Sequence, residues 1–182
     1  MNVTKPFIDG LIVFQPKVFG DDRGYFFESF SRKNYKENGI NYDFVQDNIS
    51  MSKKGAVRGL HYQVGEKAQG KLCMVISGVV LDVAVDLRFG SPTFGKYYSE
   101  ILSEENHNQI WIPPGFAHGF SVLSETAIFL YKCTELYSKE HERAVIYNDP
   151  QLNIDWKVKN PIVSEKDLQA GLFKDIAKDF VY

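Results

Sequence analysis

The sequence predicts an all-β protein, a jelly-roll β-sandwich with short flanking helices, and three observations support this class. Short strand-like runs recur along the chain with turn signals between them. Their spacing is typical of a sandwich or jelly roll and not of βαβ units. Aromatic residues make up 14% of the chain, which favours strands. With 182 residues, the chain suits one domain, and we expect that domain to span 1–182.

Eleven strand-like runs follow one another between Leu11 and Tyr147. In order they are Leu11–Gln15, Gly24–Phe30, Asp43–Ser50, Ala56–Gln63, Lys71–Ser77, Val79–Leu87, Tyr97–Leu102, Gln109–Ile112, Gly119–Leu123, Ala127–Thr134 and Ala144–Tyr147. The turn signals between them include Gly20-Asp21-Asp22, Gly65, Ser77-Gly78, Gly90-Ser91-Pro92, Pro113-Pro114-Gly115 and Asn148-Asp149-Pro150. Two short helices are also expected. One covers Arg32–Asn38 and is closed by Gly39, and the other opens at a capping motif, Ser164-Glu165-Lys166-Asp167.

The run Val79–Leu87 shows the strand period most clearly. Every second residue, beginning with Val79, is a large apolar one, so one face of the strand is wholly apolar. The other face carries Asp82 and Asp86. We expect these two carboxylates to be solvated, and a place facing a pocket is the alternative.

Charge and hydropathy exclude several classes of protein. The formal net charge is −2, which gives no general attraction to nucleic acid or to an anionic membrane. No apolar stretch is long enough to span a bilayer, and Met1–Gly10 lacks the apolar run of a signal peptide. Cys73 and Cys133 both lie in apolar runs, so buried thiols are expected and not a disulfide framework. These features together predict a cytoplasmic protein.

Two of the four histidines are candidates for chemistry. His107 and His141 sit in polar turns, where a surface position is expected. His61 and His118 lie in apolar, strand-like contexts next to glycine. A titratable group in such a setting is a candidate functional residue, although a hydrogen-bonded core histidine is the alternative for each.

Metal, nucleophile and phosphate-loop chemistry all find little support in the sequence. Metal sites in jelly rolls usually draw clustered His and Glu from one strand pair, and neither His61 nor His118 has such a neighbour. No Gly-x-Ser-x-Gly elbow and no Gly-rich phosphate loop is present. An anion would instead meet Arg23, Arg58 and Lys71, if these converge.

Proton transfer next to a carbonyl is the chemistry that remains. His61 would act as base, Lys71 would stabilise an enolate oxygen, and Tyr131 would return the proton. Arg58 is also near in sequence, but on a regular strand it points away from the face of His61. Joint action of these two residues therefore requires a twist or a bulge, and Gly59 makes a bulge possible.

Nine short motifs, in order along nearly the whole chain, resemble the dTDP-4-dehydrorhamnose 3,5-epimerase family. They are Asp22-Arg23-Gly24-Tyr25-Phe26-Phe27-Glu28, Phe44-Val45-Gln46-Asp47-Asn48, Arg58-Gly59-Leu60-His61-Tyr62-Gln63, Gln69-Gly70-Lys71-Leu72, Asp82-Val83-Ala84-Val85-Asp86-Leu87-Arg88, Ile112-Pro113-Pro114-Gly115-Phe116-Ala117-His118-Gly119-Phe120, Tyr131-Lys132-Cys133-Thr134, Asn148-Asp149-Pro150 and Ser164-Glu165-Lys166-Asp167. One departure is Cys73-Met74, which stands where the family more usually has a Val-Arg-like pair.

The resemblance implies a cupin-like jelly roll that forms a homodimer and needs no metal or organic cofactor. The implied reaction converts dTDP-4-dehydro-6-deoxy-glucose to dTDP-4-dehydro-rhamnose by epimerisation at carbons 3 and 5. A separate reductase would use the product for cell-surface polysaccharide. The neighbouring subunit would supply part of each site.

The resemblance also implies a role for each matching residue. His61 matches the base and Asp167 the carboxylate that orients it. Tyr131 matches the acid on the opposite face of the sugar, and Lys71 the group near the carbon-4 oxygen. Residues that match substrate contacts are Arg58 and His118 (sugar or diphosphate) and Arg23, Glu28, Gln46, Asn48, Glu142 and Lys166 (nucleotide and diphosphate).

Structural roles are the alternatives for three of these residues: a helix cap for Asp167, a core position for Tyr131 and a strand-edge charge for Lys71. The alternative functions are an epimerase that acts at one carbon or on another nucleotide-linked 4-keto sugar, a sugar-binding jelly roll without catalysis, and a metal-dependent cupin.

Overall fold

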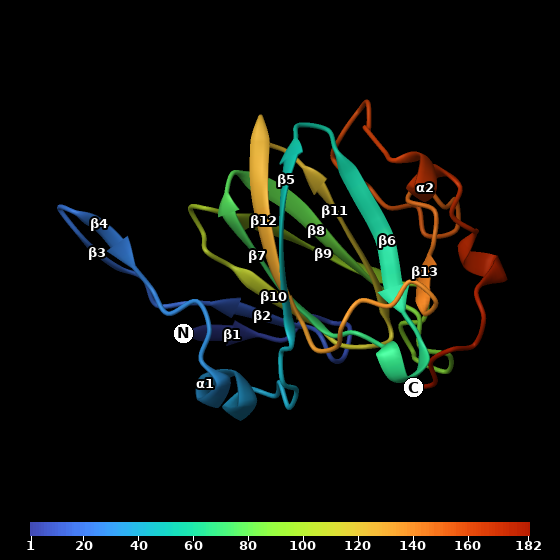
Figure 1. The fold of residues 1–182 in the computed structure, drawn as a ribbon, viewed down its shortest axis with the longest axis horizontal. Helices are drawn as coiled ribbons and strands as arrows, with labels where there is room; N and C mark the ends of the chain where they lie inside the picture. Colours follow the sequence, from blue (N-terminus) through green and yellow to red (C-terminus); the bar gives the residue numbers. More distant parts are fainter.

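The computed structural model describes residues 1–182 and consists of two antiparallel sheets that face each other, which confirms the predicted sandwich (Figure 1). The first sheet has the strand order β1-β2-β10-β7-β12-β5, and the second has the order β13-β6-β11-β8-β9. A separate hairpin, β3-β4, projects away from both sheets (Figure 1). None of the helices is long and apolar enough to cross a membrane.

The strands have the following bounds: β1 Asn2–Thr4, β2 Ile12–Gln15, β3 Phe19–Asp21, β4 Gly24–Phe26, β5 Gln46–Lys53, β6 Val57–Gln63, β7 Lys71–Ser77, β8 Val79–Asp86, β9 Tyr97–Ser103, β10 Gln109–Ile112, β11 Phe116–Val122, β12 Thr126–Cys133 and β13 Glu142–Ala144. The helices are α1 (Arg32–Glu37), α2 (Glu165–Leu168) and the two short 3-10 turns η1 (Gly65–Lys67) and η2 (Phe173–Asp175).

The predicted strands β7 and β10 have the observed bounds, and most others differ by a few residues. The expected strand Gly24–Phe30 is wrong beyond Phe26, where the hairpin ends. Strand β1 was not predicted, and β3 was not predicted because the turn signal Gly20-Asp21-Asp22 covers two of its three residues. Asp21 in fact pairs with Gly24, so the turn of this hairpin lies one residue later.

Both predicted helices form, and each has a serine cap. The side chain of Ser31 accepts a hydrogen bond from the backbone N–H of Asn34, and α1 is followed by Gly39, whose φ is 108°. The side chain of Ser164 accepts from the backbone N–H of Asp167, but α2 is only one turn long. Asp167 is therefore held at a fixed place in the first turn of α2, and its side chain is 5% exposed.

The core lies between the sheets, and the second sheet is also covered on its outer side. A cluster of 15 buried residues fills the interior and includes Phe120 and Phe129, which stack on each other. A second cluster of 13 packs the C-terminal residues Leu152, Trp156 and Phe173 against the outer face of the β6-β11-β8 region. Strand β8 is thus buried on both faces, since every residue after Val79 is buried.

The expectation that Asp82 and Asp86 are solvated is wrong, because both carboxylates are fully buried. Asp86 accepts hydrogen bonds from Arg88, Ser91 and Thr93. Burial opposes ionisation of Asp86, but these hydrogen bonds outweigh it and hold the pKa of this carboxyl below its usual value. Asp82 pairs with His118, which is described below.

We expect Gly78→Ala to destabilise the protein strongly, because a Cβ there would press against the Thr126 carbonyl and lie 2.6 Å from Ser124 Oγ. Gly90 is a matched control: it has the same φ of 87°, but a Cβ there would meet nothing within 4 Å. Backbone strain alone should lower the free energy of unfolding by about 1 kcal/mol in Gly90→Ala, and strain plus overlap by about 3 kcal/mol in Gly78→Ala. Urea denaturation of both variants measures the difference, and equal losses would contradict the overlap.

Candidate active site

A cavity of about 490 Å³ opens between the two sheets and beside α2. Its walls bring together five of the predicted site residues from the second sheet and α2, namely Arg58, His61, His118, Lys166 and Asp167. Lys71 and Tyr131 line the same cavity from the first sheet. A neighbouring pocket of about 300 Å³ shares His61, Lys71 and Tyr131 with it, so the two are adjoining compartments.

His61 and Asp167 form a close pair. Nε2 of His61 lies 2.7 Å from Oδ1 of Asp167, and the side chains are 32% and 5% exposed. Burial opposes ionisation of Asp167, but hydrogen bonds from His61 and Gly59, the charge of His61 and the nearby Ser164 side chain outweigh it, so the pKa of Asp167 lies below the usual value. An ionised Asp167 accepts a hydrogen bond from Nε2–H, which leaves Nδ1 of His61 as the free nitrogen able to take up a proton.

A bulge in β6 lets Arg58 and His61 share the cavity. His118 pairs with His61 and Phe120 pairs with Arg58, so three steps along β6 match two steps along β11. Gly59 lies at this irregularity with φ of 133°, and a Cβ on it would come 2.6 Å from the Cα of Gly119. The bulge predicted from Gly59 is therefore present, and both side chains line one cavity.

Tyr131 and Lys71 face His61 from the opposite sheet. Tyr131 lies on β12 and Lys71 on β7, which are paired strands, and Nζ of Lys71 lies 5.9 Å from the centroid of the Tyr131 ring. Burial raises the pKa of Tyr131 to about 12, so its phenol keeps its proton at neutral pH. A proton donor and a proton acceptor thus stand on opposite walls of the cavity.

His118 belongs to a second histidine–aspartate pair, deeper than the first. Its Nε2 lies 2.9 Å from Oδ2 of Asp82. Burial lowers the pKa of His118 more than Asp82 raises it, so the imidazole is neutral at pH 7. Of the other two histidines, His107 was expected at the surface but is only 8% exposed, because the rings of Tyr25 and Phe27 pack on it.

The neighbouring pocket collects polar side chains that suit a nucleotide. Gln46 and Asn48 lie on the inward face of β5, where Gln46 donates to Asn48. Glu142 on β13 accepts hydrogen bonds from Lys166 and from the hydroxyl of Tyr137. Tyr137 was not predicted as a site residue. The only sign of it in the sequence is an aromatic residue within a polar loop, and its side chain is exposed in the structure.

Two predicted site residues lie outside both compartments. Arg23 is at the tip of the β3-β4 hairpin, where its side chain is 90% exposed and pairs with Asp21. Glu28, at the base of the same hairpin, is also exposed and accepts a hydrogen bond from Asn34. Within one chain, therefore, the structure does not bring these two residues to His61.

The fold and the cavity define a class of protein: a cupin-like β-sandwich with a histidine–aspartate pair and a tyrosine on facing walls of one cavity. The family model described as dTDP-4-dehydrorhamnose 3,5-epimerase matches residues 5–175 of the chain. This chain belongs to that family of nucleotide-sugar epimerases, as the resemblance of its motifs implied.

Relatives and solved structures agree with this assignment. A dTDP-4-dehydrorhamnose 3,5-epimerase of Pseudomonas aeruginosa is 55% identical over 177 residues, which cover 96% of this chain and 97% of that protein. The crystal structure of dTDP-6-deoxy-D-glucose-3,5-epimerase RmlC from Legionella pneumophila, in complex with dTDP-4-keto-L-rhamnose, superposes with a TM-score of 0.95. It is 51% identical, and the match covers 100% of this chain and 98% of that one. The structure of ChmJ, a 3'-monoepimerase from Streptomyces bikiniensis in complex with dTDP-quinovose, matches at 30% identity with a TM-score of 0.87, over 93% and 86% of the chains.

Proposed function

We propose that this chain carries out its family's reaction with His61 as base, Tyr131 as acid and Lys71 as the group that stabilises the enolate. The reaction converts dTDP-4-dehydro-6-deoxy-glucose to dTDP-4-dehydro-rhamnose and supplies dTDP-rhamnose biosynthesis. The observation that carries the proposal is the placement of the His61–Asp167 pair and Tyr131 on facing sheets across one cavity.

In this mechanism the carbon-4 ketone acidifies the hydrogens on carbons 3 and 5. Nδ1 of His61 removes one of them, and Asp167 stabilises the imidazolium that forms. The ammonium of Lys71 stabilises the enolate oxygen. Tyr131 then delivers its phenolic proton to the carbon from the other face of the ring, which inverts it. His61 then loses its proton to solvent and Tyr131 regains one from solvent, and the same two proton transfers at the second carbon complete the conversion.

We propose that the substrate spans both compartments. The sugar would occupy the larger cavity, with Arg58 and His118 as its contacts. The dTDP group would lie in the smaller pocket with Gln46, Asn48 and Glu142, and Lys166 would neutralise part of the diphosphate charge. Because the chain carries a net charge of −2, such local cations are what an anionic substrate requires.

A homodimer would complete this site. The hairpin β3-β4 exposes large apolar side chains, with Phe19 at 54% and Phe26 at 69% exposed. The outer face of the first sheet is also apolar, since Ile49 on β5 is 69% exposed. A second copy would cover both surfaces, and its hairpin would bring Arg23 and Glu28 to this chain's nucleotide compartment.

We further propose that residues 1–182 act as one catalytic domain in the cytoplasm, with no nucleic-acid partner. Two free, buried cysteines fit a reducing compartment. The net charge and the anionic substrate both argue against a nucleic-acid surface.

Proton NMR in D2O tests the reaction. The purified chain is incubated with dTDP-4-dehydro-6-deoxy-glucose, and a parallel tube adds the partner reductase and NADPH. We expect deuterium at carbons 3 and 5, and NADPH oxidation only when this chain is present. Exchange at carbon 3 alone would instead indicate a single-carbon epimerase, and binding without any exchange a sugar-binding protein.

A further inference from the structure

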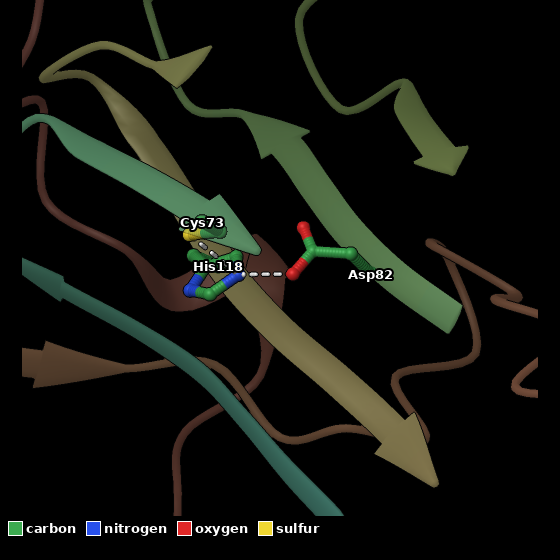
Figure 2. Close-up of side chains that lie close together, drawn as sticks. All are labelled: Cys73, Asp82 and His118. Carbon is green, nitrogen blue, oxygen red and sulfur yellow. Dashed lines mark hydrogen bonds and ion pairs between the residues drawn. The ribbon is translucent and has the colours of Figure 1, made fainter. Parts of the chain in front are cut away.

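Beneath the active-site cavity, three side chains that can bind metal ions meet between the two sheets. Cys73 comes from β7 in the first sheet, and Asp82 on β8 and His118 on β11 come from the second. Figure 2 shows the three side chains pointing toward one another from their separate strands. Cys73 and Asp82 are fully buried, and His118 is 6% exposed.

The distances within this cluster suit the coordination sphere of a tetrahedral ion. Nε2 of His118 lies 2.9 Å from Oδ2 of Asp82 and 3.8 Å from Sγ of Cys73, and the three ligand atoms all lie within 4.8 Å of one another. Usual zinc bond lengths place neighbouring ligand atoms of a tetrahedron about 3.3 to 3.7 Å apart. The His118–Cys73 distance is close to this spacing, and the His118–Asp82 distance would have to open by about 0.4 Å.

A second observation points to a ligand here. Oδ1 of Asp82 is buried and has no hydrogen-bond partner, which is costly for a carboxylate oxygen. An ion bound by the carboxylate of Asp82 would satisfy this oxygen, with Cys73 and His118 as the other two protein ligands. The thiolate and imidazole in this set favour zinc-like, thiophilic ions over magnesium or calcium.

We propose that Cys73, Asp82 and His118 form a binding site for one thiophilic divalent cation, such as Zn²⁺ or Cd²⁺, and that the bound ion inhibits the enzyme. The site goes beyond the proposed function, and only the inhibition rests on it. His118 also lines the substrate cavity, so the cavity supplies an entry path. An ion bound to Nε2 would fix the His118 ring, so that the ring could not change its position to contact the sugar.

Binding of the ion is balanced by the release of a proton. Binding to the neutral imidazole releases one proton, from the Cys73 thiol, while the imidazole proton moves from Nε2 to Nδ1. The charge of Lys71 repels the ion, so we expect weaker binding than at structural zinc sites.

Titration of the metal-free chain with Cd²⁺ tests the site, because cadmium thiolates absorb in the ultraviolet. We expect a charge-transfer band that saturates at one Cd²⁺ per chain, and a higher melting temperature because the ion links both sheets. Cys73→Val should lose the band and bind more than about 100-fold more weakly. Cys133→Val is the matched control, since Cys133 is equally buried but outside the cluster. It should keep the band, and Mg²⁺ should produce neither effect.

The opposite results would overturn the site: no band in the unaltered chain, equal binding in Cys73→Val, or equal loss in Cys133→Val. Cys73→Ser removes the soft donor with a side chain of similar size, and replaces the valine variant if that one fails to fold. For the inhibition, Cd²⁺ should stop deuterium exchange and EDTA should restore it. If the Cd²⁺ band forms but deuterium exchange is unchanged, the inhibition is rejected and the metal site stands. If the chain shows no deuterium exchange even without Cd²⁺, the proposed function is rejected, and the presence or absence of the band still tests the metal site.

Discussion

Replacing His61 with alanine should lower deuterium exchange at carbons 3 and 5 by about 10²- to 10⁴-fold, the usual contribution of a general base. His61 is the only histidine that lines both compartments, and Asp167 holds its ring by a contact of 2.7 Å. In the cavity, only His61 has a free imidazole nitrogen together with an ionised carboxylate partner that a helix cap holds in place. This partner is Asp167, and the cap is that of α2. Proton NMR of the substrate in D2O measures the loss directly.

The control for this prediction is His141→Ala, because His141 hydrogen-bonds to Ser138 and lines neither compartment. Its exchange rate should stay near that of the unaltered chain. Asp167→Asn keeps the shape of the carboxylate but removes its charge, so it should lower the exchange rate and leave substrate binding nearly unchanged. Near-normal turnover of His61→Ala would reject the assignment of the base.

Replacing Tyr131 with phenylalanine should separate exchange from inversion. The ring and its packing against Phe129 remain, but the proton donor on the second wall is lost. His61 would still remove a proton and return deuterium to the same face, so exchange should persist at a reduced rate. Formation of the inverted product should fall by about 10²-fold or more. NMR distinguishes the two, because exchange and inversion give different spectra.

Tyr97→Phe is the matched control, because it removes a tyrosine hydroxyl that lies outside the cavity. Tyr97 is also a strand residue, but its hydroxyl accepts a hydrogen bond from the backbone of Asp155 and lies outside the cavity. Both exchange and inversion should be unaffected in this variant. If Tyr131→Phe formed the inverted product at the normal rate, another group would have to be the acid.

Much of the fold could be predicted from the sequence because strand signals are local. Alternating residues in Val79–Leu87 and glycine at the turns predict β8 and its neighbours without any knowledge of their partners. The class of chemistry could be predicted as well, since His61 and Tyr131 lie in motifs that resemble one family. Ser164 and Asp167 predict the start of α2 for the same local reason.

Burial and pairing, in contrast, were decided by the tertiary structure. Asp82 was expected in solvent because alternation along one strand does not reveal that its face, which it shares with Val80 and Ala84, packs against the first sheet. The pair His61–Asp167 joins residues 106 positions apart, and only the packing of α2 beside β6 sets their 2.7 Å contact. Cys73 meets Asp82 and His118 for the same reason. Strand period and turn chemistry are properties of neighbouring residues, and the sequence alone determined them. Which side chains share a cavity depends on how two sheets close over each other, and only the folded chain decided that.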